Sequence, residues 1–375
     1  MVLDGCGLSA YNLQVLVGLN FLSVGVRFVN GTQEEWSSPT ASEILSKAAD
    51  RSHRFDFGVW FWGDAIAFDG LLDASELLGD DRHASYCGRF MEVWLKRAFS
   101  WTDYLAPGLA AYRLVNSGAI HFAPALQRLL DFYLKITPRG DNGLHYFRPD
   151  LPQYRTTVLV DSLYHVPPFV AACGQHFREK KLYVEALHIW KTHARALALP
   201  GKALLHHNYD RGTGRLRGYG WGRGNGWALL GLVDLIQLLP ADLAAEPVAE
   251  FSALSSEIVQ LQDESGFWRT LLHDRESYLE TSTAGFYGAA FSKAIRLGIL
   301  PESYRESIEA AWKALVSRID DEGGAFGTSA VTWAANLLAE DSSLYRAAPT
   351  EVNVWGQGAA LRFASERIRL QSVSK

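Results

Sequence analysis

Residues Trp227 to Leu239 read WALLGLVDLIQLL and are apolar at nearly every position. A helix that is apolar all round is buried on more than one side, as an inner helix would be. Between residues 183 and 199, in contrast, apolar side chains step by three and four along the sequence, which places them on one helical face. These side chains belong to Val184, Leu187, Trp190, Ala194 and Leu197. The two kinds of segment predict two layers of helices, one inside the other.

From about Ser42 onward the same theme recurs, a helical-period segment followed by a cluster of Gly, Pro or Asp. This pattern predicts an all-α fold of roughly ten to twelve helices. Because no Pro/Ser-rich linker separates the helices, we expect one closed array of helical hairpins, an α/α barrel. A superhelical stack of helix pairs would show the same periodicity, but it would also carry a strict repeat, and the sequence shows none. We expect residues 1–42 to be an N-terminal extension of unclear role and residues 43–375 to form a single barrel domain.

The charge balance excludes a protein that binds nucleic acid through a basic face. The 375 residues carry 36 Lys and Arg against 41 Asp and Glu, a net charge of −5, without a block of like charges. The three cysteines, Cys6, Cys87 and Cys173, cannot all pair, and none lies at the spacing of a metal site. We therefore expect no disulfide scaffold, no metal and no other cofactor.

The N-terminal region contains an apolar run, Leu13 to Val29, that has the length of a secretory core. Only Asp4 is charged before it, and Asn20 and Arg27 interrupt it, so the run predicts neither a signal peptide nor a membrane span. The tripeptide at residues 30–32 forms an isolated glycosylation sequon, which has meaning only in a secreted protein. We expect a cytoplasmic location, with secretion left open as the alternative.

The most unusual segment, residues 218–227, reads GYGWGRGNGW and leads directly into the apolar helix. A glycine-rich entry to a helix can hold a phosphate, but this spacing matches neither a P-loop nor a dinucleotide motif, and we expect no strand before it. Two indole rings, Trp221 and Trp227, flank Arg223. Aromatic faces and a guanidinium suit a sugar that carries a carboxylate. A tight helix-capping turn with packed tryptophans is the structural alternative.

Two carboxylates stand in apolar or aromatic surroundings. Asp161 lies in VDSLYHVPPF, residues 160–169, ahead of a helix that begins near a proline pair. Asp103 lies in WTDYLAPG, residues 101–108. Each could serve as a proton-transfer group, and each could equally be a helix cap, since Asp is a common capping residue.

In combination and in this order, the motifs of the chain resemble glycoside hydrolase family 105, the unsaturated rhamnogalacturonyl hydrolases, and the related family 88 unsaturated glucuronyl hydrolases. The resemblance covers about residues 43 to 370. Asn225 favours family 105, because family 88 members characteristically carry Gln there. The motifs are Asp161-Ser-Leu-Tyr164 leading to Pro168-Phe169, Trp221-x-Arg223-Gly-Asn225-Gly-Trp227, Gln262-Asp263-x-x-Gly266-x-Trp268, Glu280-Thr281-Ser282, Arg296-x-Gly298-x-Leu300 and Trp355-Gly-Gln357-Gly358.

The resemblance implies a barrel of six helical hairpins, an (α/α)6 barrel, with a pocket for a terminal 4,5-unsaturated uronic acid. It implies that Asp161 is the general acid and base and that Asp103 is the second aspartate of the site. Arg223, Trp227 and His207 would belong to the substrate pocket.

Further roles follow from the chemistry of these groups. Arg223 and His207 would hold the carboxylate and hydroxyls of the sugar, and Trp221 would offer a stacking face beside Trp227. Glu280-Thr281-Ser282 is interpreted as a helix start and loop anchor, because no base accompanies the serine. The segment before Asp161 departs from the family, since it places His145 one position early.

The expected substrate is therefore an oligosaccharide produced by a polysaccharide lyase, of the unsaturated galacturonyl-rhamnose type. The alternatives are a hydrolase acting on unsaturated or intact glucuronyl residues, and a non-catalytic sugar-binding relative on the same barrel. The sequence gives no indication of the oligomeric state or of the sugar on the leaving side.

Overall fold

The structure is a computed structural model that describes residues 39–55, 57, 62–96, 98, 107–137, 139–140, 142–329 and 341–373. The predicted N-terminal extension, residues 1–42, falls almost entirely outside these ranges, so it and the boundary of the barrel domain stay predictions. The first described helix begins at Ala41, after Thr40 and Glu43 form a reciprocal capping box.

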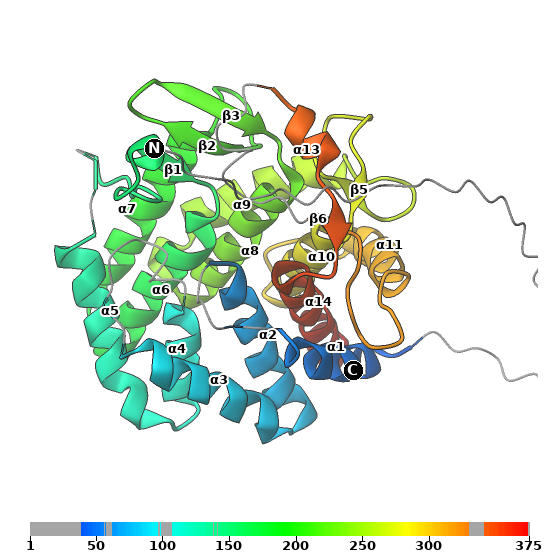
Figure 1. Cartoon of the computed structure of the whole chain (residues 1–375), viewed down its shortest axis with the longest axis horizontal. Helices are drawn as coiled ribbons and strands as arrows, with labels where there is room; N and C mark the ends of the chain where they lie inside the picture. Colours follow the sequence, from blue (N-terminus) through cyan, green and yellow to red (C-terminus); the bar gives the residue numbers. More distant parts are fainter. Residues whose placement is uncertain are drawn as a thin grey trace, which may run out of the picture. The chain divides into compact units, whose positions relative to one another are not determined.

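The described helices form two layers around one ring (Figure 1). The outer helices are α1 (Ala41–Ser52), α3 (Asp81–Trp94), α5 (Ala123–Lys135), α7 (Lys180–Leu197), α9 (Ala245–Val259) and α11 (Arg305–Val316). The inner helices are α2 (Trp62–Leu78), α4 (Gly108–Asn116), α6 (Ser162–Phe177), α8 (Gly222–Leu238), α10 (Thr281–Arg296) and α14 (Val354–Val373).

The inner helices close a ring. Each of α2, α4, α6, α8, α10 and α14 packs against the next, and α14 packs against α2. Each outer helix packs against the inner helix that follows it in the chain, or against a neighbour of that helix. Six outer helices thus alternate with six inner helices along the described chain, which confirms the predicted (α/α)6 barrel.

Burial separates the two layers as the sequence predicts. In α8 every residue from Gly222 to Ile236 is buried. In α7 burial is confined to one face, which includes Leu187, Trp190 and Leu197. Val184 is wrongly assigned to that face, because its side chain is 59% exposed.

Short strands line one rim of the ring, at the top of Figure 1. Strands β1 (Thr157–Leu159), β2 (His206–Asp210) and β3 (Arg215–Tyr219) form an antiparallel sheet in that order. The shorter pairs are β4 (Trp268–Arg269) with β5 (Leu279–Glu280), and β6 (Thr328–Ser329) with β7 (Thr350–Glu351); a short helix, α13 (Ser343–Ala347), precedes β7. The described residues also contain 3-10 turns at Ile120–Phe122, Pro152–Tyr154, Ala241–Leu243 and Glu302–Tyr304.

Strand β3 corrects one expectation, because a strand does precede the glycine-rich segment. It pairs antiparallel with β2 and leads into α8 within a few residues. A phosphate-binding loop follows a strand of a parallel sheet, so this arrangement still gives no phosphate site.

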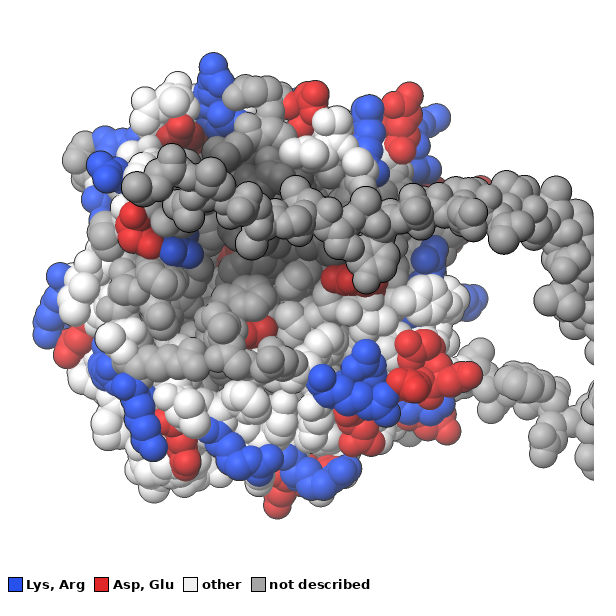
Figure 2. Space-filling view, in the orientation of Figure 1, with Lys and Arg blue, Asp and Glu red and all other residues white. Residues whose placement is uncertain are grey.

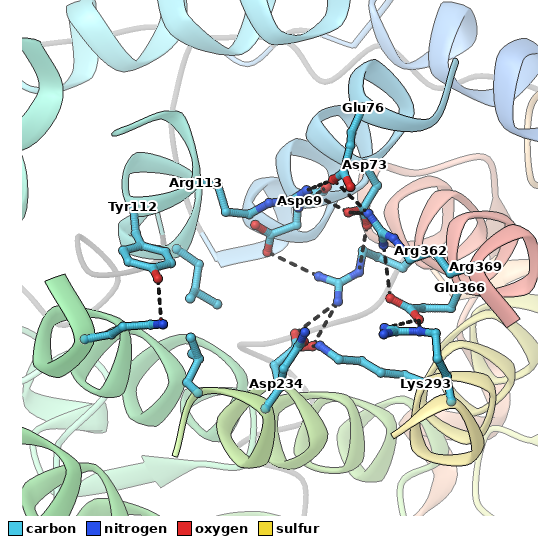
Figure 3. A pocket seen from close by; sticks show the side chains of 15 residues that line it. Asp69, Asp73, Glu76, Tyr112, Arg113, Asp234, Lys293, Arg362, Glu366 and Arg369 are labelled. Carbon is cyan, nitrogen blue, oxygen red and sulfur yellow. Dashed lines mark hydrogen bonds and ion pairs between the residues drawn. The ribbon is translucent and has the colours of Figure 1, made fainter. Parts of the chain in front are cut away.

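The inner helices all run in the same direction, because an outer helix returns the chain between each pair. Their C-terminal halves are joined by buried ion pairs around Arg362 of α14 (Figure 3). Its guanidinium donates to both carboxylate oxygens of Asp234 on α8, at 3.0 and 3.1 Å, and lies 3.3 Å from Asp73 on α2. Lys293 of α10 also pairs with Asp234, and Arg369 pairs with Asp73 at 2.9 Å. These contacts tie four inner helices together at one end, which we call the far end.

Charges on the visible surface are mixed in sign. In Figure 2 the described Lys and Arg side chains lie among Asp and Glu side chains around the rim. Among the described helices, none combines the length and the apolar character needed to cross a membrane.

Candidate active site

Asp161 lies at the junction of β1 and α6, at the N-terminal end of the inner ring. The backbone N–H of Val160 donates to the carbonyl of His207 at 3.0 Å, which fixes the junction against β2. Asp161 occupies the residue before α6 with helical backbone angles, and its side chain makes no capping hydrogen bond within the described structure. The capping alternative therefore does not explain this carboxylate. The prediction that the proline pair initiates this helix is wrong, because α6 begins at Ser162 and both Pro167 and Pro168 lie inside it.

The environment of Asp161 suits a proton donor. The residue is only 4% exposed, and its Oδ2 has no hydrogen-bond partner among the described residues. Burial raises the pKa of the Asp161 carboxyl to about 7, although the Arg223 charge and a backbone hydrogen bond oppose the shift. A carboxyl with this pKa is partly protonated near neutral pH and can both give and take a proton.

His207, Trp221 and Tyr345 form a compact group beside this carboxyl. The Nδ1 atom of His207 lies 2.7 Å from the Tyr345 hydroxyl, and its ring centroid lies 4.0 Å from that of Trp221. The Asp161 charge contributes to a raised pKa of Tyr345, which places this phenol within electrostatic reach of the carboxyl. Burial lowers the pKa of His207 to about 3, so the imidazole is neutral and its Nε2 has no partner in the described part of the chain.

A glycine allows this group to close up. Gly218 has a φ of +66°, and a Cβ atom there would lie 2.7 Å from His207 Cβ and closer still to the Tyr345 hydroxyl. A side chain at this position would therefore separate His207 from Tyr345.

Arg223 is fully buried and forms an ion pair with Glu280, the residue before α10. Its Nη1 also donates to the carbonyl of Ser329 at 3.3 Å, and its Cζ lies 4.8 Å from the ring centroid of Trp221. The Glu280 carboxylate accepts a second hydrogen bond, at 2.6 Å, from the Ser282 hydroxyl. The charge of Arg223 is thus compensated before any substrate binds, and Glu280 orients the guanidinium.

Trp227 is predicted to offer a stacking face to the sugar, but its ring is packed in the protein core. It is fully buried, and its ring contacts Tyr164 and Phe286 at centroid distances of 5.0 and 4.5 Å. Asn225 likewise has a structural role, since its side chain bonds the backbone of Leu205 in both directions. Only part of the glycine-rich motif therefore faces the candidate site.

The structure brings together four of the six residues predicted for the site, namely Asp161, Arg223, Trp221 and His207. Trp227 packs against Tyr164, His165 and Phe286 in the core. Asp103 lies outside the described residues, so its role stays a prediction. His206 turns away from this group, and its Nδ1 lies 2.9 Å from the carbonyl of Leu197.

Sequence reasoning missed two residues of the site, Tyr345 and Glu280. Tyr345 had no motif around it. Glu280 stood in a motif that was interpreted as a helix start, which the beginning of α10 at Thr281 confirms. Its second role, as the partner of Arg223, could have been suspected because a buried arginine requires a carboxylate.

The cavity at the far end has a volume of about 490 Å³ and is lined by charged side chains (Figure 3). Those side chains pair with one another across the inner helices, as in the bonds between Arg362 and Asp234. Burial does raise the pKa of Asp69 there, but its Oδ2 accepts a hydrogen bond from Tyr164 at 2.7 Å. The predicted site residues that the structure describes do not line this cavity, so we assign it a structural role. The described residues contain no group of three or more side chains suited to a metal.

Comparison with known families gives a match over nearly the whole chain. The sequence profile described as Glycosyl Hydrolase Family 88 matches residues 36–371. The chain is 23% identical over 344 residues to the unsaturated rhamnogalacturonyl hydrolase YesR of Bacillus subtilis, covering 88% of this chain and 95% of that protein. It is 33% identical over 159 residues to an unsaturated 3S-rhamnoglycuronyl hydrolase of Formosa agariphila, covering 40% of this chain and 39% of that one.

Solved structures agree on the fold. A possible member of family GH105 from Salmonella enterica superposes with a TM-score of 0.78 at 22% identity, over 91% of this chain and 99% of the other. The unsaturated glucuronyl hydrolase of Bacillus sp. GL1 superposes with a TM-score of 0.65 at 16% identity, over 87% and 94%. At these identities the superpositions support the barrel.

Proposed function

Because the chain belongs to glycosyl hydrolase family 88, together with relatives that are unsaturated uronyl hydrolases, we propose that it removes a terminal 4,5-unsaturated uronic acid from oligosaccharides released by a polysaccharide lyase. The observation that carries this proposal is the environment of Asp161. Its carboxyl is buried and has a pKa of about 7, and its Oδ2 has no partner among the described residues. Such a carboxyl is suited to protonating carbon at neutral pH.

The chemistry needs only one carboxyl group. The C4=C5 double bond of the substrate is attached to the ring oxygen and forms a vinyl ether. Asp161 gives its proton to C4, and positive charge develops on C5 and the ring oxygen. Water then adds to C5 while the Asp161 carboxylate accepts one of its protons, and the resulting hemiketal opens and releases the sugar at C1. The two carboxylates at fixed separation that ordinary glycosidases use are therefore not required.

The remaining residues have supporting roles in this proposal. Arg223 holds the uronate carboxylate through guanidinium N–H groups, with Glu280 fixing its orientation. His207 is neutral, so it contributes a hydrogen bond and no charge. Trp221 offers an aromatic face to the sugar, and Asp103 assists Asp161. The inner helices α6, α8, α10 and α14 all begin at this site, and their positive ends favour an anionic substrate.

We propose an unsaturated galacturonyl-rhamnose disaccharide, a fragment of pectin, as the substrate. The printed name of the Bacillus subtilis relative supports this choice. The terminal ring cannot distinguish galacturonate from glucuronate, because C4 loses its configuration when the double bond forms. Selectivity must therefore come from the anomeric linkage and the leaving sugar, and the relative from Formosa agariphila keeps a rhamnoglycuronyl substrate as the second candidate.

The test is the position at which solvent oxygen enters the product. The purified protein is incubated in ¹⁸O-labelled water with the unsaturated galacturonyl-rhamnose disaccharide, while loss of the ultraviolet absorbance of the alkene is followed. Label at C5 is expected. Label at C1 would show direct glycoside hydrolysis. No loss of absorbance with any lyase product would leave a hydrolase of intact glucuronides and the non-catalytic relative as the alternatives.

A further inference from the structure

His165 is an unusual buried histidine. It lies on inner helix α6 and is only 6% exposed, yet neither ring nitrogen has a hydrogen-bond partner in the described part of the chain. The other buried histidines near it in the sequence are different. His193 and His206 each face a backbone carbonyl, and His145 lies 3.1 Å from the Tyr133 hydroxyl.

The unpaired nitrogens have a cost and a chemical character. A buried polar group without a partner destabilises a folded protein, because it loses its hydrogen bonds to water and gains none in return. Burial lowers the pKa of His165 to about 3, so the ring is neutral and presents one N–H donor and one lone pair. A hydroxyl group, which also donates one bond and accepts another, is the natural complement.

The position of His165 places those nitrogens inside the ring of inner helices. Asp161 has helical backbone angles immediately before α6, so His165 follows it by one helical turn and lies on the same side of the helix. The His165 ring lies 5.5 Å from that of Trp227 on α8. The imidazole therefore lies between α6 and α8, one turn further into the barrel than the proton donor.

We infer that His165 hydrogen-bonds the C3 hydroxyl of the bound uronide and is a specificity-determining residue of the site. This inference rests on the proposed function. The terminal sugar enters the pocket with its non-reducing side first, and Asp161 reaches C4. His165 lies one helical turn deeper than Asp161, so it faces the side of the sugar ring that points away from the leaving sugar. On that side C4 carries no hydroxyl, but its neighbour C3 does.

The rival explanation is that His165 is an ordinary core residue. The two explanations differ in how stability and activity respond together. If the ring nitrogens of His165 bind the substrate, His165→Leu should lower the activity. The variant should keep the thermal stability of the wild type, because it removes a polar group that has no partner among the described residues of the free protein. His165→Gln keeps a neutral donor and acceptor and should restore part of the activity.

Ser255 provides a matched control. It lies on outer helix α9, is fully buried, and its hydroxyl has no partner within the described residues. Ser255→Ala therefore removes an unpaired buried polar group from the outer layer of helices, at a residue that the proposal gives no part in the site, and its activity should equal that of the wild type.

The experiment compares kcat/KM of the wild type, His165→Leu, His165→Gln and Ser255→Ala on an aryl glycoside of 4,5-unsaturated uronic acid and on its 3-deoxy counterpart. We expect His165→Leu to lose about tenfold to a hundredfold on the hydroxylated substrate, the range for a lost hydrogen bond that leaves its partner unpaired. On the 3-deoxy substrate the same variant should lie within about threefold of the wild type.

An equal loss on both substrates, or a loss accompanied by a lower melting temperature, would overturn the role of His165 in reading the hydroxyl. So would unchanged activity of His165→Leu. These outcomes differ from failure of the proposed function, in which the wild type itself would turn over neither glycoside.

Discussion

At the far end of the inner helices, Arg362 is bonded to Asp234 at 3.0 and 3.1 Å and lies within 3.8 Å of Asp69. At the opposite end, Asp161 and His207 each keep a buried polar atom without a partner among the described residues. The same ring of helices therefore holds two different polar clusters. In the far-end cluster, ion pairs join charged side chains of different helices, although single atoms such as Asp69 Oδ1 have no hydrogen bond there. In the site-end cluster, Asp161 Oδ2 and His207 Nε2 have neither a hydrogen bond nor an ion pair within the described part of the chain.

The contrast separates stability from function. Paired charges at the far end hold four inner helices in register. Unpaired groups at the site end lower stability unless a ligand completes them, and natural proteins keep such groups where they are used. A cavity whose charged side chains pair with one another across helices is therefore weaker support for a functional site than a buried carboxyl whose Oδ2 has no partner among the described residues.

The largest expected effect is a loss of stability when the ion pairs at the far end are broken. Arg362→Met leaves Asp234 and Asp73 buried with fewer cations, so the free energy of unfolding should fall by about 3 to 5 kcal/mol. The rate per folded molecule should stay near that of the wild type, because the bonds of Arg362 go to Asp234, Asp73 and the Tyr164 hydroxyl and to none of the residues proposed for catalysis. Chemical denaturation measures the first quantity, and turnover corrected for folded protein measures the second.

Arg54→Met is the control for Arg362. It removes an ion pair with Glu322 in which both side chains are more than half exposed. Such pairs contribute about 0 to 1 kcal/mol. A similar loss in both variants would contradict the structural role of the far-end network, and a large loss of turnover in Arg362→Met would mean that the two ends are coupled.

The second expected effect is a loss of turnover when the carboxyl at the site end is replaced. Asp161→Asn should keep the fold and lower kcat by at least about a hundredfold, the usual scale for a lost general acid and base. Steady-state kinetics at a substrate concentration above KM measures the change. Near-normal turnover in a folded variant would remove Asp161 from the mechanism.

The same variant has an opposite effect on stability, with a defined pH dependence. The folded-state pKa of Asp161 is about 7, above its ordinary value of 3.8, so the folded protein binds the proton more tightly than the unfolded chain. The wild type therefore loses stability as pH rises from about 4 to about 7. Asp161→Asn should be more stable than the wild type at pH 8, by on the order of a few kcal/mol, and the difference should vanish near pH 3. Thermal melts across this range would contradict the assignment if the difference did not change with pH.

The sequence predicts the barrel, which the structure confirms, and most residues of the candidate site, and the two predictions rest on different physical features. Apolar periodicity distinguishes α8 from α7, because it reports burial directly. At about 100° per residue, however, Val184 lies about 120° around the helix from Trp190, and the spacing rule places it on the buried face although it lies at its edge. Such edge positions depend on the neighbouring helix, which a local pattern does not contain.

The site residues divide in the same way. Asp161 and Arg223 stand in local motifs, so they were found. Tyr345 reaches His207 from a position 138 residues further along the chain, and nothing in its own surroundings indicates that contact. Unpaired atoms are also invisible in a sequence, which is why His165 gained meaning only from the fold.

The smallest expected effect is a change in substrate binding on substitution of Arg223. This residue resembles the paired cations of the far end but lies at the site end. Arg223 is fully buried and paired with Glu280, like the cations of the far end, but it lies beside Asp161. Arg223→Lys keeps the positive charge for Glu280 and loses the planar fork that binds a carboxylate through two N–H groups. We expect binding of the unsaturated disaccharide to weaken by about 1 to 3 kcal/mol, the range for hydrogen bonds to charged groups.

An ester of the same disaccharide decides what Arg223 does. The ester has no carboxylate charge, so the wild type and Arg223→Lys should bind it with nearly equal affinity when binding is measured by calorimetry with Asp161→Asn as the background. If both ligands lose affinity equally, Arg223 serves to hold β6 and α10 together through Ser329 and Glu280, as the far-end arginines do for their helices. If only the acid loses affinity, the ion pair with Glu280 orients a guanidinium that recognises the substrate, and a buried pair at the site end has a function that the pairs at the far end lack.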